Sequence, residues 1–193
     1  MICTHRLTAP RLKANGQLDF SNPESVKQLT KTLLRKDFGL KIELPDDRLC
    51  PPVCPAFRFR SRLTDHLLKV PNRLNYLLWI QALLDTTSES YSGSFDPKRE
   101  VIGLDIGTGA SCVYPLLGCS QRPNWRFAGT DIDDRSLQFA QQNVQINGLQ
   151  QRIKLHQSKP DSPLLPLDDL RLSEYSPFSL RAFNILLKFF SQN

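Results

Sequence analysis

The chain has 193 residues, of which 40% are hydrophobic and 23% are charged, and its formal net charge is +6. A chain of this length can bury one substantial core, which excludes a large multidomain protein. It contains no run of about 18 uncharged apolar residues, and residues 1–6 lack the apolar centre of a secretory signal. We therefore expect a soluble intracellular protein with no membrane segment.

The cysteines argue against both a disulfide framework and a metal site. They are odd in number, namely Cys3, Cys50, Cys54, Cys112 and Cys119. Most lie in apolar or loop contexts, which does not indicate a pattern of paired bridges. The spacing of Cys50 and Cys54 would suit zinc, but no second Cys/His pair follows closely. We predict no metal.

The positive charge is unevenly distributed along the chain. The whole excess lies in residues 1–99, because residues 100–193 carry equal numbers of basic and acidic side chains. A basic half joined to a neutral half favours a polyanionic partner, whose phosphates Lys and Arg would contact. A modest excess that only keeps a helical surface soluble explains the charge equally well.

Residues 1–99 have the pattern of a helical region. A first helix begins at Asn22-Pro23, a capping residue followed by proline, and ends at Gly39. Residues 41–44 alternate polar and apolar side chains, which predicts a short strand or an extended arm. A second helix begins near Pro71 and carries an apolar face through Leu83 and Leu84. A Ser/Thr/Gly-rich linker follows.

From residue 100 the pattern alternates between strand and helix. Strands are predicted over residues 101–105, 125–130 and 152–156. The first intervening helix begins near Ala110. The second begins at Asp133-Asp134 and ends at Asn147-Gly148, where we interpret Asn147 only as a helix stop. The alternation is lost after the third strand.

Two spaced glycines and a distant aspartate form the most informative motif. Gly107 and Gly109 follow the first predicted strand, which is typical of a tight turn that lets the backbone approach a ligand. Asp131 ends the second strand, where a carboxylate can accept hydrogen bonds from both hydroxyls of a ribose. The motif predicts a site for S-adenosylmethionine.

A dinucleotide-dependent oxidoreductase is the competing interpretation of the glycine turn. Its fingerprint needs a third glycine at the position that Cys112 occupies. Asp105, two residues before Gly107, suits a cationic ligand better than a pyrophosphate. The methyl donor is therefore favoured, and a purely structural glycine turn is the remaining alternative.

The order of several motifs resembles that of a known family of RNA adenine-N6 methyltransferases. This family includes the enzyme that modifies the U6 spliceosomal RNA and the bacterial enzyme that modifies 23S ribosomal RNA. The resemblance rests on residues 18–26, 29–34, 37–40, 71–76, 105–111, 114–118 and 130–133. It implies an α/β fold with a Rossmann-like class I methyltransferase sheet and a helical N-terminal extension. It also implies S-adenosyl-L-methionine as cofactor and structured RNA, snRNA or rRNA, as partner.

The resemblance also gives individual residues a role. Arg73 is similar to the arginine that reaches the methionyl carboxylate of the donor, and a surface arginine is its alternative. Gly107 and Ser111 resemble the loop that contacts the methionyl part, and Asp131 resembles the acid that binds the ribose. Ser162 lies where the family places a hydroxyl near the donor adenine, and a solvated loop serine is its alternative.

Two departures from the family pattern bear on activity. Residues 54–70 form an apparent insertion that carries half of the excess charge, which weakens the argument for RNA binding from charge. The family's Asn-Pro-Pro-Phe tetrad, which holds the target adenine, is missing from the sequence, and Ser-Pro-Phe at 176–178 lacks the asparagine. No catalytic residue is therefore assigned.

We expect two domains and an impaired enzyme. Residues 1–99 form a basic, helical RNA-binding module with a linker, and residues 100–193 form a truncated S-adenosylmethionine-binding α/β domain with an incomplete sheet. Donor binding is expected to be weakened and turnover to be small or nil. A non-catalytic RNA-binding or regulatory product is the alternative. The resemblance implies a location in the nucleus, with the cytoplasm as a second location.

Overall fold

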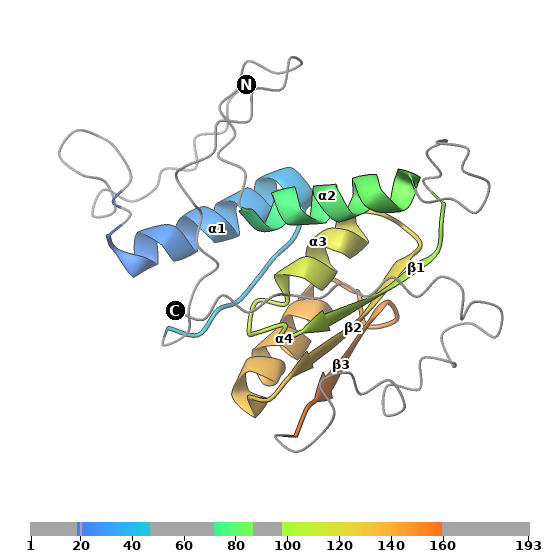
Figure 1. Cartoon of the computed structure of the whole chain (residues 1–193). Coiled ribbons are helices and arrows are strands. Elements are labelled where there is room, and N and C mark those ends of the chain that lie inside the picture. The colour runs from blue at the N-terminus through green and yellow to red at the C-terminus, as the bar shows by residue number, and fades with distance from the viewer. Residues whose placement is uncertain (1–18, 20, 47–71, 87–97, 160–193) are drawn as a thin grey trace, which may run out of the picture.

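A computed structural model describes residues 19, 21–46, 72–86 and 98–159 (Figure 1). Four helices and three strands lie in these ranges, in the order α1, α2, β1, α3, β2, α4, β3. The predicted linker, the apparent insertion at 54–70, Ser162 and the Ser-Pro-Phe sequence lie outside the described residues. No helix within the described ranges is both long enough and apolar enough to cross a membrane.

The three strands form a parallel sheet, as the alternating pattern predicted. Strands β1 (Val101–Ile106), β2 (Trp125–Asp131) and β3 (Ile153–Gln157) pair in the order β1-β2-β3. Each agrees with its predicted range to within one residue at either end. Every residue of β1 is buried, which explains the run of apolar residues before Asp105. Because successive parallel strands are neighbours and such crossovers are right-handed, both connecting helices lie on one face of the sheet (Figure 1).

The helices form layers over that face. Helices α3 (Val113–Gln121) and α4 (Asp134–Ile146) contact the strands directly. Helices α1 (Pro23–Phe38) and α2 (Asn72–Thr86) pack on α3 from its outer side (Figure 1). One hydrophobic core runs through these layers and includes Leu34 of α1, Leu77 of α2, Leu117 of α3 and Phe127 of β2. The N-terminal helices therefore share a core with the α/β part.

Close packing of α3 on the sheet depends on two glycines. The Phe127 ring of β2 lies between Gly103 of β1 and Gly118 of α3. A Cβ atom added at Gly103 would lie 2.5 Å from that ring, and one added at Gly118 would lie 2.4 Å from it. Real Cβ atoms do not approach so closely. The Phe127 ring therefore fits between β1 and α3 only because both positions are glycine.

The predicted ends of α1 are confirmed, and most of its buried positions carry polar side chains. The Asn22 side chain accepts a hydrogen bond from the Glu24 amide at 2.9 Å, and Gly39 ends the helix in a left-handed conformation with φ 68°. The most buried positions before Leu34 are polar, Lys27 among them. Its ammonium lies 2.6 Å from Asp46 and 2.8 Å from Glu24. These hydrogen bonds raise the pKa of Lys27 above its usual value and keep it charged.

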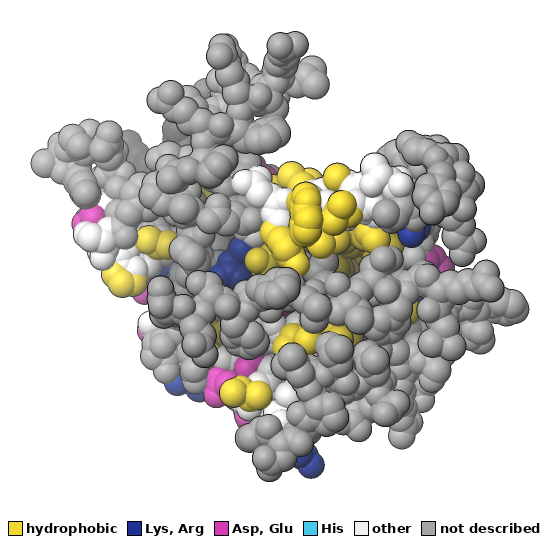
Figure 2. Space-filling view, in the orientation of Figure 1, with side chains coloured by type: hydrophobic (Ala, Val, Ile, Leu, Met, Phe, Trp, Pro, Cys, Tyr) yellow, Lys and Arg dark blue, Asp and Glu magenta, His cyan; other side chains and the backbone are white. Residues whose placement is uncertain are grey.

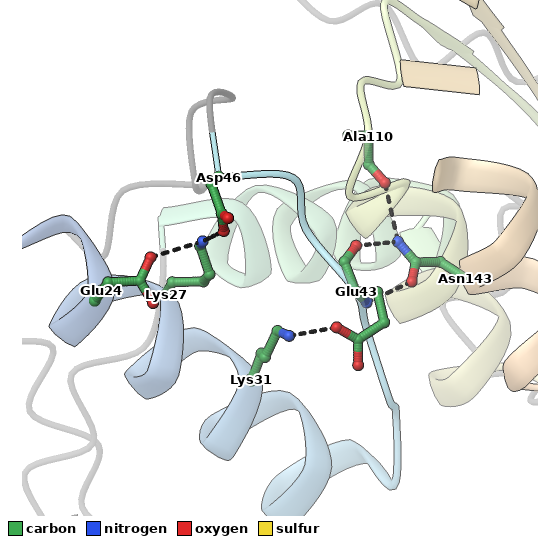
Figure 3. Close-up of polar contacts among 7 residues, drawn as sticks. All are labelled: Glu24, Lys27, Lys31, Glu43, Asp46, Ala110 and Asn143. Carbon is green, nitrogen blue, oxygen red and sulfur yellow. Dashed lines mark hydrogen bonds and ion pairs between the residues drawn. The ribbon is translucent and has the colours of Figure 1, made fainter. Parts of the chain in front are cut away.

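The segment after α1 is extended, as the alternation at 41–44 predicted. Ile42 and Leu44 are buried, whereas Lys41 and Glu43 are exposed. The backbone of this segment pairs with the side-chain amides of Asn143 in α4 and of Asn147 directly after it, rather than with a neighbouring strand. Figure 3 shows the pairing of Glu43 with Asn143. We call residues 40–46 the docked arm.

The apolar residues of α2 extend over more than one side of the helix. Leu77 and Leu84 are buried as the predicted face requires. Leu83, assigned to the same face, is instead 42% exposed, and Leu78 and Trp79 are also exposed. Figure 2 shows these hydrophobic side chains gathered over α2. The prediction for Leu83 was wrong because a helix that is apolar on several sides does not reveal from spacing alone which side packs.

Candidate functional site

The glycine motif forms a loop between β1 and α3, which we call the glycine loop (residues 107–112). Gly107 and Gly109 adopt left-handed conformations with φ 69° and 65°, and Cys112 also has a positive φ of 49°. Helix α3 therefore begins at Val113, three residues later than the predicted start near Ala110. Left-handed backbone cannot continue a right-handed helix, so the loop and not the helix occupies these positions.

The loop crosses from β1 to the carboxyl end of β2. The Thr108 amide donates to the Thr130 carbonyl at 2.9 Å. The Gly109 amide donates to Oδ2 of Asp131 at 2.8 Å. Gly107, Gly109 and Asp131 thus come together at one edge of the sheet, as the strand-helix-strand spacing predicted. In α/β folds ligands bind at this carboxyl edge.

Asp131 is held from both sides and keeps acceptor capacity. Its Oδ1 accepts a hydrogen bond from the Asp133 amide at 3.0 Å, while Oδ2 accepts the one from Gly109. Its side chain lies at the last position of β2 and is only partly buried. A carboxylate oxygen can accept more than one hydrogen bond, so two hydroxyl donors can still be accommodated. The geometry suits the predicted ribose contact, which itself stays a prediction.

Arg73 lies beside the start of α3. Its guanidinium carbon is 5.7 Å from the centroid of the Tyr114 ring, and that ring meets Tyr76 edge-on at 5.5 Å. Contact of a guanidinium with an aromatic face fixes the direction of the long side chain. Because Tyr114 is the second residue of α3, the charge of Arg73 lies at the same end of that helix as the glycine loop.

The start of α3 is suited to an anion. The N-cap residue Cys112 makes no side-chain cap hydrogen bond, so the helix start lacks the usual side-chain acceptor. The helix dipole and the nearby Arg73 both favour a negative group there. A carboxylate such as that of a methionyl group fits this chemistry.

Asp105 is completely buried at the end of β1. Burial of Tyr76 is the largest cause of its raised pKa, and the negative charge of Asp105 is the second. Burial is also the largest cause of the raised pKa of Tyr114, to which Asp105 contributes. Burial is likewise the largest cause of the raised pKa of Cys112. These neighbours are therefore neutral at physiological pH, and Cys112 is not a reactive thiolate.

The remaining predicted site residues have different outcomes. Ser111 lies in the glycine loop and is buried, at 8% exposure. Ser162 lies outside the described residues. Among the described residues no group of three or more His, Cys, Asp or Glu side chains could hold a metal ion, and Cys50 and Cys54 are not among them.

Sequence reasoning missed the part played by Asn143. Its side chain is completely buried and donates to the carbonyl of Ala110 in the glycine loop at 2.9 Å. The signal was present, because Asn143 lies three residues after Ala140 on the buried side of α4. An amide among buried helix positions indicates a polar partner. The interpretation of Asn147 as only a helix stop was also incomplete, because its amide binds the backbone of Lys41.

Comparison with known proteins gives a consistent answer. A family model described as RNA methyltransferase matches residues 6–166. The U6 small nuclear RNA (adenine-(43)-N(6))-methyltransferase of Schizosaccharomyces pombe is 40% identical over 152 residues, which are 79% of this chain and 34% of that protein. The RNA N(6)-adenosine-methyltransferase METTL16 of Homo sapiens is 39% identical over 149 residues, which are 75% of this chain and 22% of that protein.

Solved structures agree with the sequence comparison. The N-terminal domain of human METTL16 in complex with SAH matches with a TM-score of 0.63 and 37% identity, covering 81% of this chain and 52% of that one. The hMettl16 catalytic domain in complex with MAT2A 3'UTR hairpin 6 matches with a TM-score of 0.56 and 37% identity, covering 77% of this chain and 43% of that one. The parallel sheet and its helices thus have the predicted Rossmann-like class I methyltransferase fold.

The family match covers most of the chain, whereas the chain spans only about a third or less of the curated relatives named above. Its matched residues include both N-terminal helices, the glycine loop and Asp131. Sequence identities above one third to these relatives and the fold shared with the solved domain support the same family. The chain belongs to the RNA methyltransferase family.

Proposed function

We propose that this chain binds S-adenosyl-L-methionine at the carboxyl edge of its sheet. We also propose that its role is in the N6-methylation of adenine in RNA. The observation that carries the proposal is the hydrogen bond from the Gly109 amide to Asp131, which brings the glycine loop and the acid of β2 to one place. The related human METTL16 domain was solved with SAH, the demethylated form of the same donor. The donor supplies the methyl group when bound.

We assign a partner to each group of the donor. Arg73 and the start of α3 would hold the methionyl carboxylate, since both favour an anion. Gly107 and Ser111 would border the methionyl chain, and Asp131 would accept from the ribose hydroxyls. Ser162, which lies outside the described residues, stays a proposal for the donor adenine, with a solvated loop serine as its alternative. The chain's own contribution would be to bind and orient the donor, which would supply a methyl group for transfer to a base nitrogen.

The proposed partner is structured RNA. The names of the relatives specify U6 small nuclear RNA, and one solved relative holds an RNA hairpin. The basic residues 1–99 support the assignment of RNA contact to the N-terminal module, because Lys and Arg bind phosphates without regard to sequence. We assign the α/β part from residue 100 to the donor, and we place the protein in the nucleus, with the cytoplasm as a second location.

The expected result of a donor titration is measurable binding of SAH that depends on Arg73. Arg73→Ala should weaken binding about tenfold or more, because a charge-assisted hydrogen bond contributes about 1.5–3 kcal/mol. Arg73→Lys should recover only part of the affinity, since lysine lacks the planar fork. Isothermal titration calorimetry measures both.

The matched control is Arg35→Ala, which removes an exposed arginine of α1. It should leave SAH affinity within about twofold of the parent chain. Equal weakening by Arg73→Ala and Arg35→Ala would contradict the role of Arg73. No binding of SAH by the parent chain would contradict the proposed donor site.

We further propose that the 193-residue chain transfers little or no methyl group by itself. The sequence carries no Asn-Pro-Pro-Phe tetrad, the group that holds the flipped target adenine in the family. Incubation with labelled donor and a structured RNA should leave the RNA unlabelled, while a salt-dependent gel shift still detects RNA binding. Robust labelling would refute this proposal. RNA binding without donor binding would favour the alternative of a non-catalytic RNA-binding product.

A further inference from the structure

Asn143 of α4 connects two segments that are far apart in the chain. Its Oδ1 accepts from the Glu43 amide at 2.6 Å, and its Nδ2 donates to the Glu43 carbonyl and to the Ala110 carbonyl, each at 2.9 Å (Figure 3). The side chain is completely buried. Because a carboxamide has two N–H donors, both are used by these two carbonyls.

One end of this connection is the glycine loop. Ala110 lies directly after Gly109, whose amide binds Asp131, and directly before Ser111. A hydrogen bond to the carbonyl of Ala110 fixes the peptide plane between residues 110 and 111. Since neighbouring peptide planes share the Cα atom, holding this plane restricts the directions of the loop amides.

The other end is the docked arm, which is itself tied to α1. Glu43 lies 2.6 Å from the ammonium of Lys31, and Asp46 lies 2.6 Å from that of Lys27 (Figure 3). A continuous set of contacts therefore runs from α1 through the docked arm and Asn143 to Ala110. Segments that share buried hydrogen bonds of this kind move together or lose those bonds.

We propose that Asn143 is a positioning residue that sets the glycine loop in its ligand-binding geometry, through the same side chain that holds Glu43 of the docked arm. The inference rests on the proposed function, because it assigns the loop to the methyl donor. Donor binding and the contact between Asn143 and Glu43 are then coupled, and the coupling acts in both directions.

Asn147, the residue directly after α4, provides a matched control. It lies four residues after Asn143 and binds the same arm, accepting from the Lys41 amide at 2.9 Å and donating to the Lys41 carbonyl at 2.7 Å. It also donates to the carbonyl of Asn143 in the last turn of α4 at 2.7 Å. Asn147→Ala therefore removes the contact of the docked arm at Lys41 without removing a contact to the glycine loop.

The first experiment compares Asn143→Ala with Asn147→Ala in the whole chain. Without ligand, Asn143→Ala should speed amide hydrogen exchange in residues 107–112 at least tenfold, and Asn147→Ala should change it less than twofold. With SAH, Asn143→Ala should raise Kd about tenfold and Asn147→Ala less than twofold. Equal effects of the two variants, or no effect, would overturn the proposal. So would an Asn143→Ala chain that no longer folds, because the residue would then support the whole domain rather than the loop.

The second experiment uses the unchanged chain and needs no variant. Saturation with SAH should slow exchange of the Glu43 amide, which binds Asn143, by at least threefold more than exchange of the Lys41 amide, which binds Asn147. Equal slowing of both amides would overturn the coupling. Failure of the unchanged chain to bind SAH would refute the proposed donor site instead, while the ligand-free exchange of the variants would still decide whether Asn143 positions the loop.

Discussion

Asp131→Ala is expected to abolish detectable binding of SAH. The change removes two acceptor positions for ribose hydroxyls, and hydrogen bonds to a charged group contribute about 1.5–3 kcal/mol each. It also releases the Gly109 and Asp133 amides, which the carboxylate now holds at 2.8 Å and 3.0 Å. A loss of about 3 kcal/mol or more corresponds to a Kd more than about a hundredfold higher. Isothermal titration calorimetry measures this directly.

Two further variants separate the ribose contact from general charge. Asp134→Ala removes an exposed carboxylate three residues away, which accepts a hydrogen bond from Gln138 of the same helix, and should leave SAH affinity within about twofold. Asp131→Asn keeps one carbonyl acceptor and should show an intermediate loss. If Asp131→Ala binds SAH within about threefold of the parent chain, Asp131 is not the ribose acid.

Gly118→Ala is expected to destabilise the fold by about 2 kcal/mol. The new Cβ would lie 2.4 Å from the Phe127 ring, which cannot move away because Gly103 borders its other edge. Overpacking of this kind costs about 3 kcal/mol at the upper end, and alanine recovers about 1 kcal/mol over glycine in a helix. The midpoint of urea unfolding, with the slope held constant, gives the change in the free energy of unfolding.

A double-mutant cycle checks that the ring is the cause. Phe127→Leu alone should destabilise the fold, because it leaves space in the core between β1 and α3. In its presence Gly118→Ala should cost less than about 0.5 kcal/mol, since the clashing ring atoms are gone. Additive costs in the double variant would show that the conflict lies elsewhere in α3.

The alternation of strand and helix was predictable because it depends on neighbours along the chain. Asn22, Gly39 and the apolar runs of β1 and β2 each act within a few residues, and the structure confirms their elements. The closeness of Gly109 and Asp131 was also predictable, since parallel strands joined by a right-handed crossover end at the same edge.

The start of α3 was misplaced because local composition does not encode the sign of φ at Cys112. A non-glycine residue adopts a positive φ only where its surroundings fix it, and Cys112 is completely buried. In the same way, the exposure of Leu83 depends on which side of α2 meets α3, and helical spacing does not contain that information.

By itself the sequence determined the order of the elements, the parallel α/β class, the family and the glycine-aspartate pair. These follow from hydrophobic period, turn residues and ordered motifs, all of which act over short stretches of chain. Only the tertiary structure decided that Asn143 joins Glu43 to Ala110 and that Arg73 lies over Tyr114. Those contacts join residues that are tens of positions apart, and their partners are chosen by packing and by the need of buried polar groups for hydrogen bonds.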